Sequence, residues 1–400
     1  MHRRRNSIED WAVSGIKLAN MRKYATTWLI FMIVVGILAF LIKYPPIQKS
    51  QPIMIRDTMS LRHIAERNDV PLHALTPLLS PEKRVGVLTT FENIHKPLSD
   101  LSIDKQSIRA AIQAERTLGV PFKDLIRYIL LSLWIGSAGL LLFRKQNILR
   151  IRTVWLGFTV LVFGLILGAS PNPMEAIVRF HKLIKGIPGN PLVLVIAGFA
   201  IFSLLSILGS RMLCSWGCPL GALQESLYNI PVFKTFKKKH KFSFSASIAV
   251  RITVYLFFIL LLFGILNINQ GGPGSILYHH FNLFKLFTPY ELAVFTLFLI
   301  PVFVLASLSI FRPFCHTICP FGLWAWFLEK AAIYRVKKIH LESCLDCGAC
   351  EQACPTGAIQ SIITDEKHFF QPDCWSCARC LDACPQGTLG FSSSRRNKLR

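Results

Sequence analysis

The sequence predicts a mainly α-helical membrane protein that ends in a small cysteine-rich domain, and three observations lead to this fold class. Hydrophobic residues make up 52% of the 400 residues and charged residues only 17%, a balance typical of membrane proteins. Several apolar stretches approach the roughly 20 residues that a helix needs to cross a bilayer. All 12 cysteines fall in four short motifs within the second half of the chain.

Six apolar stretches are predicted to be membrane-spanning helices. Arg127 lies near the start of the second stretch and Arg251 near the start of the fifth, where their long side chains are expected to extend to the interface. In chain order the stretches are Thr26–Ile42, Leu125–Phe143, Thr153–Ala169, Pro191–Gly209, Ile248–Leu266 and Tyr290–Phe311.

The basic residues predict which side of the membrane each loop occupies. Arg3, Arg4, Arg5, Lys17, Arg22 and Lys23 precede the first stretch, which favours a cytoplasmic N-terminus. Six spans then return the C-terminus to the cytoplasm, and the loops after the second, fourth and sixth stretches are also basic. The net charge of +23 is therefore attributed to topology and lipid headgroups, and nucleic acid is not an expected partner.

This topology divides the chain into five parts. Residues 1–43 hold the cytoplasmic N-terminus and first span, and 44–123 form a small helical insert outside the cytoplasm. Residues 124–335 form the membrane core, 340–391 a cytoplasmic cysteine-rich domain, and 392–400 a basic tail. In the insert, helical spacing of apolar residues predicts two small helix–turn–helix units, with either a docking or a purely structural role. These residues are Leu61, Ile64, Ala65, Val70, Pro71 and Leu75, then Leu98, Leu101, Ile108 and Ala111.

The membrane core contains an internal repeat that carries two cysteine pairs. Arg211 precedes Cys214 and Cys218 after the fourth span, and Arg312 precedes Cys315 and Cys319 after the sixth, each in the pattern C-x3-C-P-x-G. Because residues i and i+4 share a helix face, each pair can hold one metal, and two pairs can complete a four-sulfur site. A third iron–sulfur cluster, another metal site, redox-active dithiols and simple packing all remain open for these cysteines. The two arginines suit charge neutralisation of a cluster, headgroup binding or topological anchoring.

Two upstream segments of the repeat are predicted to be interfacial helices, namely residues 174–184 and 276–284. They carry His181, His279 and His280, which either exchange protons with a quinol or are ordinary amphipathic residues.

The C-terminal domain contains the pattern C-x2-C-x2-C-x3-C-P twice. In bacterial two-cluster ferredoxins, each run gives three thiolates to one cube and its fourth thiolate to the other. This predicts one [4Fe–4S] cluster on Cys344, Cys347, Cys350 and Cys384, and a second on Cys374, Cys377, Cys380 and Cys354. Zinc sites or a disulfide framework are the alternatives, but neither requires this eight-cysteine pattern. Trp375, inside the second run, is expected either to shield a cluster from water or simply to pack.

With these motifs, residues 124–391 resemble the NapH/NosR group of membrane-bound polyferredoxins. The resemblance rests on the membrane core, the two C-x3-C-P motifs and the paired ferredoxin runs. It implies electron transfer from the quinone pool towards an outer-side redox partner such as a cytochrome or reductase, with this chain acting as a component of a quinol dehydrogenase. The chain lacks the outer flavin-attachment domain of the NosR branch, so a covalent flavin is not expected. A second resemblance, to CcoG-type oxidase-assembly proteins, implies a redox or metal-assembly role instead.

Overall fold

The computed structural model is mainly helical. It describes residues 19–33, 53–68, 70, 75–79, 93–94, 96–117, 120–143, 148–184, 192–232, 237, 243–262, 282–288, 294–339, 344–364 and 371–393. Residues 19–33 form a helix, and the remaining α-helices are α2 (Leu61–Arg67), α4 (Lys105–Thr117), α5 (Val120–Leu141), α6 (Ile148–Thr159), α7 (Pro173–Ile184), α8 (Leu192–Gly209), α9 (Pro219–Asn229), α11 (Phe244–Leu262), α13 (Val294–Ser309), α14 (Pro313–Thr317), α15 (Pro320–Glu329), α16 (Ala349–Ala353), α17 (Ala358–Ile363) and α18 (Arg379–Ala383). Two π-helical segments, η4 (Val160–Ile166) and η5 (Leu213–Gly217), and three 3-10 helices, η2 (Thr76–Leu79), η3 (Leu98–Asp100) and η6 (Leu283–Phe287), complete the helical elements.

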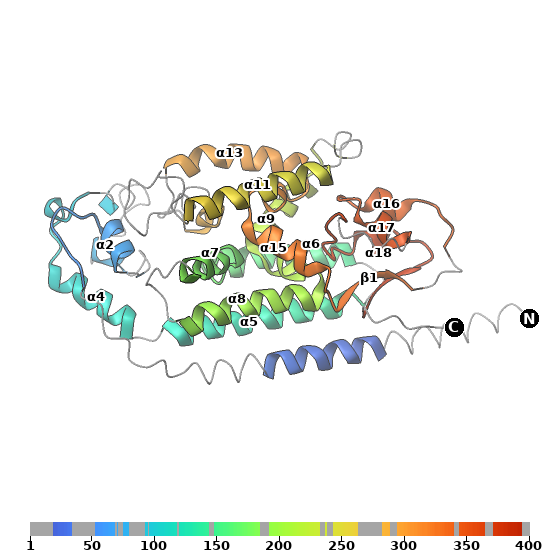
Figure 1. Cartoon of the computed structure of the whole chain (residues 1–400), viewed down its shortest axis with the longest axis horizontal. Helices are drawn as coiled ribbons and strands as arrows, with labels where there is room; N and C mark the ends of the chain where they lie inside the picture. Colours follow the sequence, from blue (N-terminus) through green and yellow to red (C-terminus); the bar gives the residue numbers. More distant parts are fainter. Residues whose placement is uncertain are drawn as a thin grey trace, which may run out of the picture.

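The long apolar helices run along the long axis of the molecule. In Figure 1, α5, α8, α11 and α13 all extend along this axis, with α5 and α8 in the lower part of the view and α11 and α13 in the upper part. The insert helices α2 and α4 lie at one end, and α16, α17 and α18 lie at the other. All six predicted apolar stretches fall at least partly on helices of the structure, since the first overlaps residues 19–33 and the others overlap α5, α6 with η4, α8, α11 and α13.

Among the described helices, Ile148–Ile166 is the one whose length and composition suit a membrane crossing. Four other apolar helical segments are shorter, namely Ile126–Leu141, Val195–Gly209, Phe244–Leu260 and Leu297–Ser309. Six crossings therefore stay a prediction.

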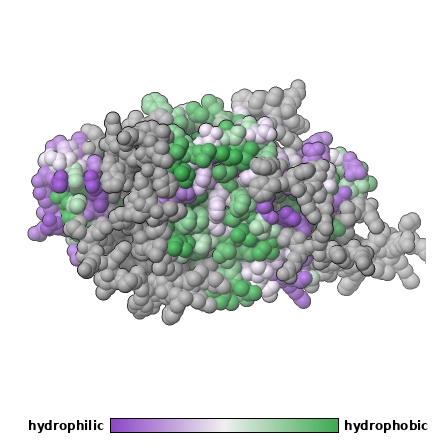
Figure 2. Space-filling view, in the orientation of Figure 1, coloured by the Kyte–Doolittle hydropathy of each residue, from purple (hydrophilic) through white to green (hydrophobic). Residues whose placement is uncertain are grey.

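The surface of the helical part is strongly apolar. Figure 2 shows a hydrophobic band across the middle of the molecule, with hydrophilic residues gathered towards the two ends. Phe298 is 72% exposed and Ile166 is 68% exposed, and other large apolar side chains on α5, α8 and α11 also face outward. Contiguous apolar surface of this kind is rare on soluble monomers and marks contact with a membrane or a partner.

Small residues let the helix at residues 19–33 pack closely on α5. A Cβ atom at Gly136 would lie 2.0 Å from the Trp28 ring, and one at Gly139 would lie 1.7 Å from the Tyr24 hydroxyl. Glycine is therefore required at both positions for this approach, as in many helix pairs within membranes. Tyr24 also contacts the ring of Tyr334 edge-on at 5.0 Å, so this helix reaches the cysteine-rich end of the molecule.

The insert has a small hydrophobic core of its own. Most residues that the helical spacing singled out are buried or packed in it, with Pro71 outside the described residues. The sequence predicted two helix–turn–helix units here. In the described part, each unit instead has one α-helix and one short 3-10 helix, namely α2 with η2 and η3 with α4. Their buried members include Leu61, Ile64, Leu75, Leu98 and Ile108.

The cysteine-rich domain is closed by a two-stranded antiparallel sheet. Strand β1 (Tyr334–Lys338), which follows α15, pairs with β2 (Leu389–Ser393), which follows the last cysteine. Between these strands lie α16, α17 and α18, so both cysteine runs are held within a domain that starts and ends in the same sheet.

A buried carboxylate joins three separate segments beneath this domain. The fully buried side chain of Glu225 on α9 accepts hydrogen bonds from Arg152 at 2.8 Å and from Arg312 at 2.6 Å, while Arg379 lies at 3.5 Å. Burial raises the carboxyl pKa, but the three guanidinium groups more than offset this and hold the pKa of Glu225 well below its usual range. Glu225 therefore stays ionised and ties α6, the start of α14 and α18 to α9.

We expect Glu225→Gln to lower the free energy of unfolding by about 3–5 kcal/mol, since it leaves buried guanidinium groups without a counter-charge. Glu175→Gln is the matched control, because Glu175 pairs with Arg179 at 3.0 Å on an exposed helix face and is worth below about 1 kcal/mol. Chemical denaturation in detergent measures both, and equal effects of the two substitutions would contradict the role of Glu225.

Candidate functional site: two cysteine runs docked on the helical core

The two ferredoxin runs fold with the same backbone pattern. In the first run Asp346 and Gly348 adopt the left-handed conformation, and Ser376 and Ala378 do so at the matching positions of the second. The fourth cysteine of each run caps the end of a short helix, Cys354 after α16 and Cys384 after α18, with extended backbone. The proline after each cysteine explains this, because it disfavours helical backbone at the residue before it. Each run is thus a loop followed by one helical turn, which spreads its cysteines along a curved path.

The structure brings the four cysteines predicted for the first cluster around one cavity. This cavity has a volume of about 130 Å³ and is lined by Cys344, Cys347, Cys350 and Cys384, together with neighbouring residues such as Thr388. Three of the cysteines come from the first run and one from the second, as in the predicted exchange of fourth ligands.

The other four cysteines also lie near one another. Cys377, Cys374 and Cys354 all lie close enough to Cys380 to raise the pKa of its thiol, and Cys350 of the first set has a smaller effect. Burial raises the pKa of the Cys374, Cys377 and Cys380 thiols. All four cysteines of this second set are half-buried, whereas Cys347 of the first set is exposed.

The donor chemistry of both sets fits an iron–sulfur cluster. All eight cysteines are free of disulfides, and cubes of this kind are held by four thiolates. Threonine hydroxyls lie near both fourth cysteines, Thr388 at 3.2 Å from Cys384 and Thr356 at 3.7 Å from Cys354. Burial raises the pKa of Cys384, but hydrogen bonds from the Thr388 side chain and nearby backbone lower it overall, which favours the thiolate that binds iron.

Within the described residues, no group of three or more His, Cys, Asp and Glu side chains is gathered tightly enough to hold a metal ion. A cube takes one thiolate at each of four irons, so its ligands are spaced more widely than those of a single ion.

The second run is packed against the end of the helical core. The Trp375 side chain is only 2% exposed, with the Arg211 guanidinium 4.4 Å and the Arg312 guanidinium 5.0 Å from its ring centre. Leu345, at the matching position of the first run, is 66% exposed. The Trp216 indole donates a hydrogen bond to the Ser376 carbonyl at 3.0 Å. One cysteine run therefore faces the core and the other faces outward.

The four core cysteines are buried directly below this contact. Cys214 lies in η5 and Cys315 in α14, whereas Cys218 and Cys319 are the N-caps of α9 and α15. The expectation that each pair shares the face of one continuous helix is wrong. The chain bends between the two cysteines, because Pro219 and Pro320 force extended backbone on the residue before them.

Arg211 and Arg312 bind protein groups and not lipid. Both are fully buried with left-handed backbone, and each reaches across to the opposite C-x3-C-P motif. Arg312 donates to the Cys214 carbonyl and to the Ser215 carbonyl at 2.9 Å, and Arg211 donates to the Gly322 carbonyl. The headgroup interpretation of these arginines is therefore wrong, and their role in membrane topology stays a prediction.

A second buried carboxylate was not foreseen from the sequence. Asp373, directly before the second run, pairs with Arg211 at 2.6 Å, with Arg251 and with His316 at 3.1 Å. Arg251 is therefore buried in an ion pair and does not extend to a lipid interface. The one signal in the sequence was an arginine inside an apolar stretch, which by default marks a site with a hidden partner. Glu225, Arg152 and Arg379 were missed in the same way.

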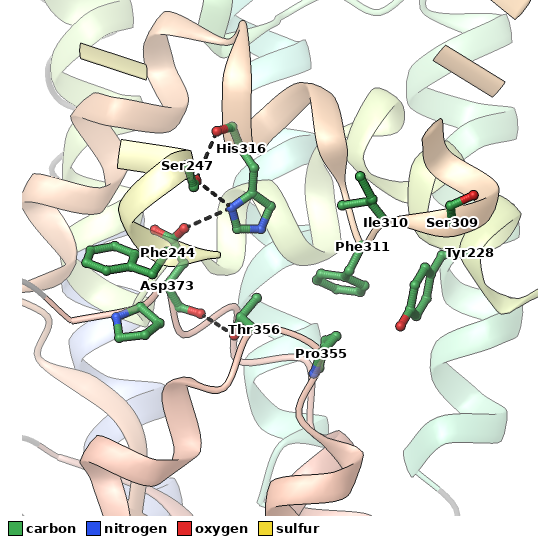
Figure 3. A pocket seen from close by; sticks show the side chains of 11 residues that line it. Tyr228, Phe244, Ser247, Ser309, Ile310, Phe311, His316, Pro355, Thr356 and Asp373 are labelled. Atoms are coloured by element: carbon green, nitrogen blue, oxygen red, sulfur yellow. Dashed lines mark hydrogen bonds and ion pairs between the residues drawn. The ribbon is translucent and has the colours of Figure 1, made fainter. Parts of the chain in front are cut away.

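His316 and Asp373 line a small pocket between the core and the domain. Figure 3 shows His316 between Ser247 of α11 and Asp373, and Asp373 beside Thr356. The His316 ring lies 3.3 Å from the Ser247 hydroxyl, and burial lowers the pKa of His316 to about 4. The cavity is only about 20 Å³, far below the roughly 300 Å³ of an organic-ligand pocket.

The helix predicted at residues 174–184 is present as α7, and its position at a membrane interface stays a prediction. Its His181 is buried, with Nδ1 2.7 Å from the Ile177 carbonyl and Nε2 2.8 Å from the Tyr255 hydroxyl of α11. His279 and His280 lie outside the described residues.

Two sequence families match this chain. A family described as 4Fe-4S dicluster domain matches residues 313–359, and one described as 4Fe-4S binding domain matches residues 191–239. The chain carries ferredoxin-type iron–sulfur sequence. Between them the matches include both C-x3-C-P motifs and the first ferredoxin run, while the second run lies beyond them.

Curated relatives share part of this sequence. YccM of Escherichia coli (strain K12), named as a candidate electron transport protein, is 27% identical over 39% of this chain and 44% of its own length. A ferredoxin-type protein of methylamine utilization, MauN of Methylorubrum extorquens, is 26% identical over 50% of this chain and 66% of its own. The chain thus spans less than half of the first relative and about two thirds of the second. No solved structure matches. These findings support an iron–sulfur electron-transfer protein.

Two double variants test whether the fourth cysteine of each run, Cys354 or Cys384, binds the cube of the other run. Cys347→Ala with Cys384→Ala removes two ligands of one cavity, so we expect loss of about one [4Fe–4S] cube. Cys377→Ala with Cys384→Ala touches both sets and should remove both cubes. Iron and sulfide counts with EPR of the reduced protein measure this, and the reverse pattern would show that each run binds its own cube.

Proposed function

We propose that this chain is a membrane-bound iron–sulfur protein that passes electrons between the quinone pool and a redox partner protein in an anaerobic-type respiratory chain. The observation that carries this proposal is the unequal placement of the two cysteine runs. The second run is buried against the end of the apolar helices through Trp375, and the first leaves Leu345 and Cys347 exposed.

In this proposal, electrons pass through the two cysteine runs between the apolar helices and the exposed surface of the domain. When bound, each [4Fe–4S] cube supplies one-electron oxidation and reduction, with a potential set by hydrogen bonds, charge and burial. Trp375 packs the Cys374–Cys380 run against the helices below it, while Arg211 and Arg312 add positive charge beside it. Leu345 and Cys347 offer an exposed surface at which a partner protein can approach.

The membrane location is supported by the apolar band of Figure 2 and by the repeated apolar helices. The basic residues support a cytoplasmic membrane with both termini inside. We expect the chain to stay in the membrane fraction after extraction with alkaline carbonate and to enter solution with detergent. Release by carbonate alone would contradict the spanning helices.

The quinone pool as electron donor is tested by anaerobic purification and EPR. We expect about eight or more irons per chain, and reduced-cluster signals that grow when a reduced menaquinone analogue is added. The control variant, with Cys347→Ala and Cys377→Ala, should lose the signals of the two cubes held by the ferredoxin runs. Clusters that dithionite reduces but the quinol does not would contradict quinol as the donor.

A redox or metal-assembly role, as in CcoG-type proteins, is the second candidate. It is favoured by the four buried thiols of the C-x3-C-P motifs, which a two-cluster ferredoxin does not need. Copper bound at these thiols in the purified protein, without quinol-linked reduction, would favour this role over electron transfer.

A further inference from the structure

The four core cysteines form a symmetric set of thiols at the junction of the two repeats. Cys214, Cys218, Cys315 and Cys319 are free of disulfides and 5–7% exposed. The Cys319 thiol interacts electrostatically with Cys214, Cys218 and Cys315, so the cysteines of both motifs lie close together. Packing alone does not require two matching pairs at one point.

Each motif presents hydrogen-bond donors to these sulfurs. Cys218 and Cys319 stand at the N-termini of α9 and α15, where the backbone N–H groups of Gly221 and Gly322 donate to them. The positive end of a helix dipole favours thiolate at such a position. The Gln224 amide donates to the Cys315 sulfur at 3.4 Å and is itself held by the Phe314 N–H at 2.9 Å.

The glycines of both motifs allow the turns around the sulfurs to close. A Cβ atom at Gly322 would lie 2.4 Å from the Cys315 carbonyl oxygen, and one at Gly221 would lie 2.6 Å from the Cys214 carbonyl oxygen. The same contact in both repeats explains why the pattern is C-x3-C-P-x-G, and it fixes the two pairs in matching geometry.

The charges around these thiols are unbalanced in favour of cations. The ion-paired network at this junction contains five guanidinium groups and three carboxylates, formed by Arg152, Arg211, Arg251, Arg312 and Arg379 with Glu225, Glu329 and Asp373. Arg211 and Arg312 are the cations that interact with the Cys214 thiol, where they favour the thiolate. The carboxylates are fewer than the guanidinium groups and are shared between them, so a further negative charge at this junction would be stabilised.

We propose that Cys214, Cys218, Cys315 and Cys319 bind an iron–sulfur cluster of their own, in addition to the two cubes of the ferredoxin runs. Four thiolates around an iron–sulfur core form an anionic group, which Arg211 and Arg312 would balance. The cluster would lie on the core side of Trp375, next to the second run. This builds on the proposed electron-transfer role, but it is tested by metal content and does not depend on quinol as donor.

The first measurement is the iron and acid-labile sulfide content of the whole chain, purified anaerobically in detergent. We expect about twelve irons if the core cluster is [4Fe–4S] and about ten if it is [2Fe–2S], and Mössbauer spectra separate the two. About eight irons, with all four core cysteines recovered as free thiols or as disulfides by mass spectrometry, would overturn the proposal. So would copper or zinc in place of iron at the core.

Two matched variants locate the additional iron. Cys214→Ala with Cys315→Ala should return the content to about eight irons. Cys344→Ala, Cys347→Ala, Cys374→Ala and Cys377→Ala together leave the core motifs intact, so any iron and sulfide that remain must be bound there. If the first variant does not fold, the second decides the proposal, because complete loss of iron from a folded chain excludes the core site. Loss of quinol reduction with ten or twelve irons retained would refute only the proposed donor.

Discussion

The contact on which the rest of the molecule depends is the burial of Trp375 against Arg211 and Arg312. Both arginines lie between two helical segments in left-handed backbone, a strained conformation that costs of order 1–3 kcal/mol per residue and persists only where surrounding contacts fix it. Here those contacts are carbonyl groups of the opposite repeat and the carboxylates of Glu225 and Asp373. One set of guanidinium groups therefore holds the two repeats together and supports the cysteine-rich domain above them.

This arrangement gives the two ferredoxin runs different surroundings although their backbones match. The first run has Leu345 exposed where the second has Trp375 buried. Because the potential of an iron–sulfur centre depends on burial, nearby charge and hydrogen bonds to sulfur, two identical ligand sets would acquire different potentials here. The fold thus makes two sites unequal without changing a single ligand.

The buried network also explains why so many arginines border apolar helices. Excess basic residues near a membrane are ordinarily read as topology. Arg152, Arg211, Arg251 and Arg312 instead have carboxylate partners that are distant in sequence, such as Asp373 for Arg251. Counting these four as orientation signals overstates the positive charge available to lipid headgroups.

The sequence alone determined the apolar helices, the repeated C-x3-C-P motifs, the spacing of the candidate ligands in the ferredoxin runs and the helical core residues of the insert. Each of these depends on local spacing, whether the period of a helix or the reach of a short loop around a cluster, and so it can be read from neighbouring residues. Only the tertiary structure decided which carboxylates partner the buried arginines, that proline bends the chain between the core cysteines, and that Trp375 faces the core while Leu345 faces outward. These features join residues far apart in the chain, as Trp216 joins Ser376, and their energies come from desolvation and ion pairing that no local pattern encodes.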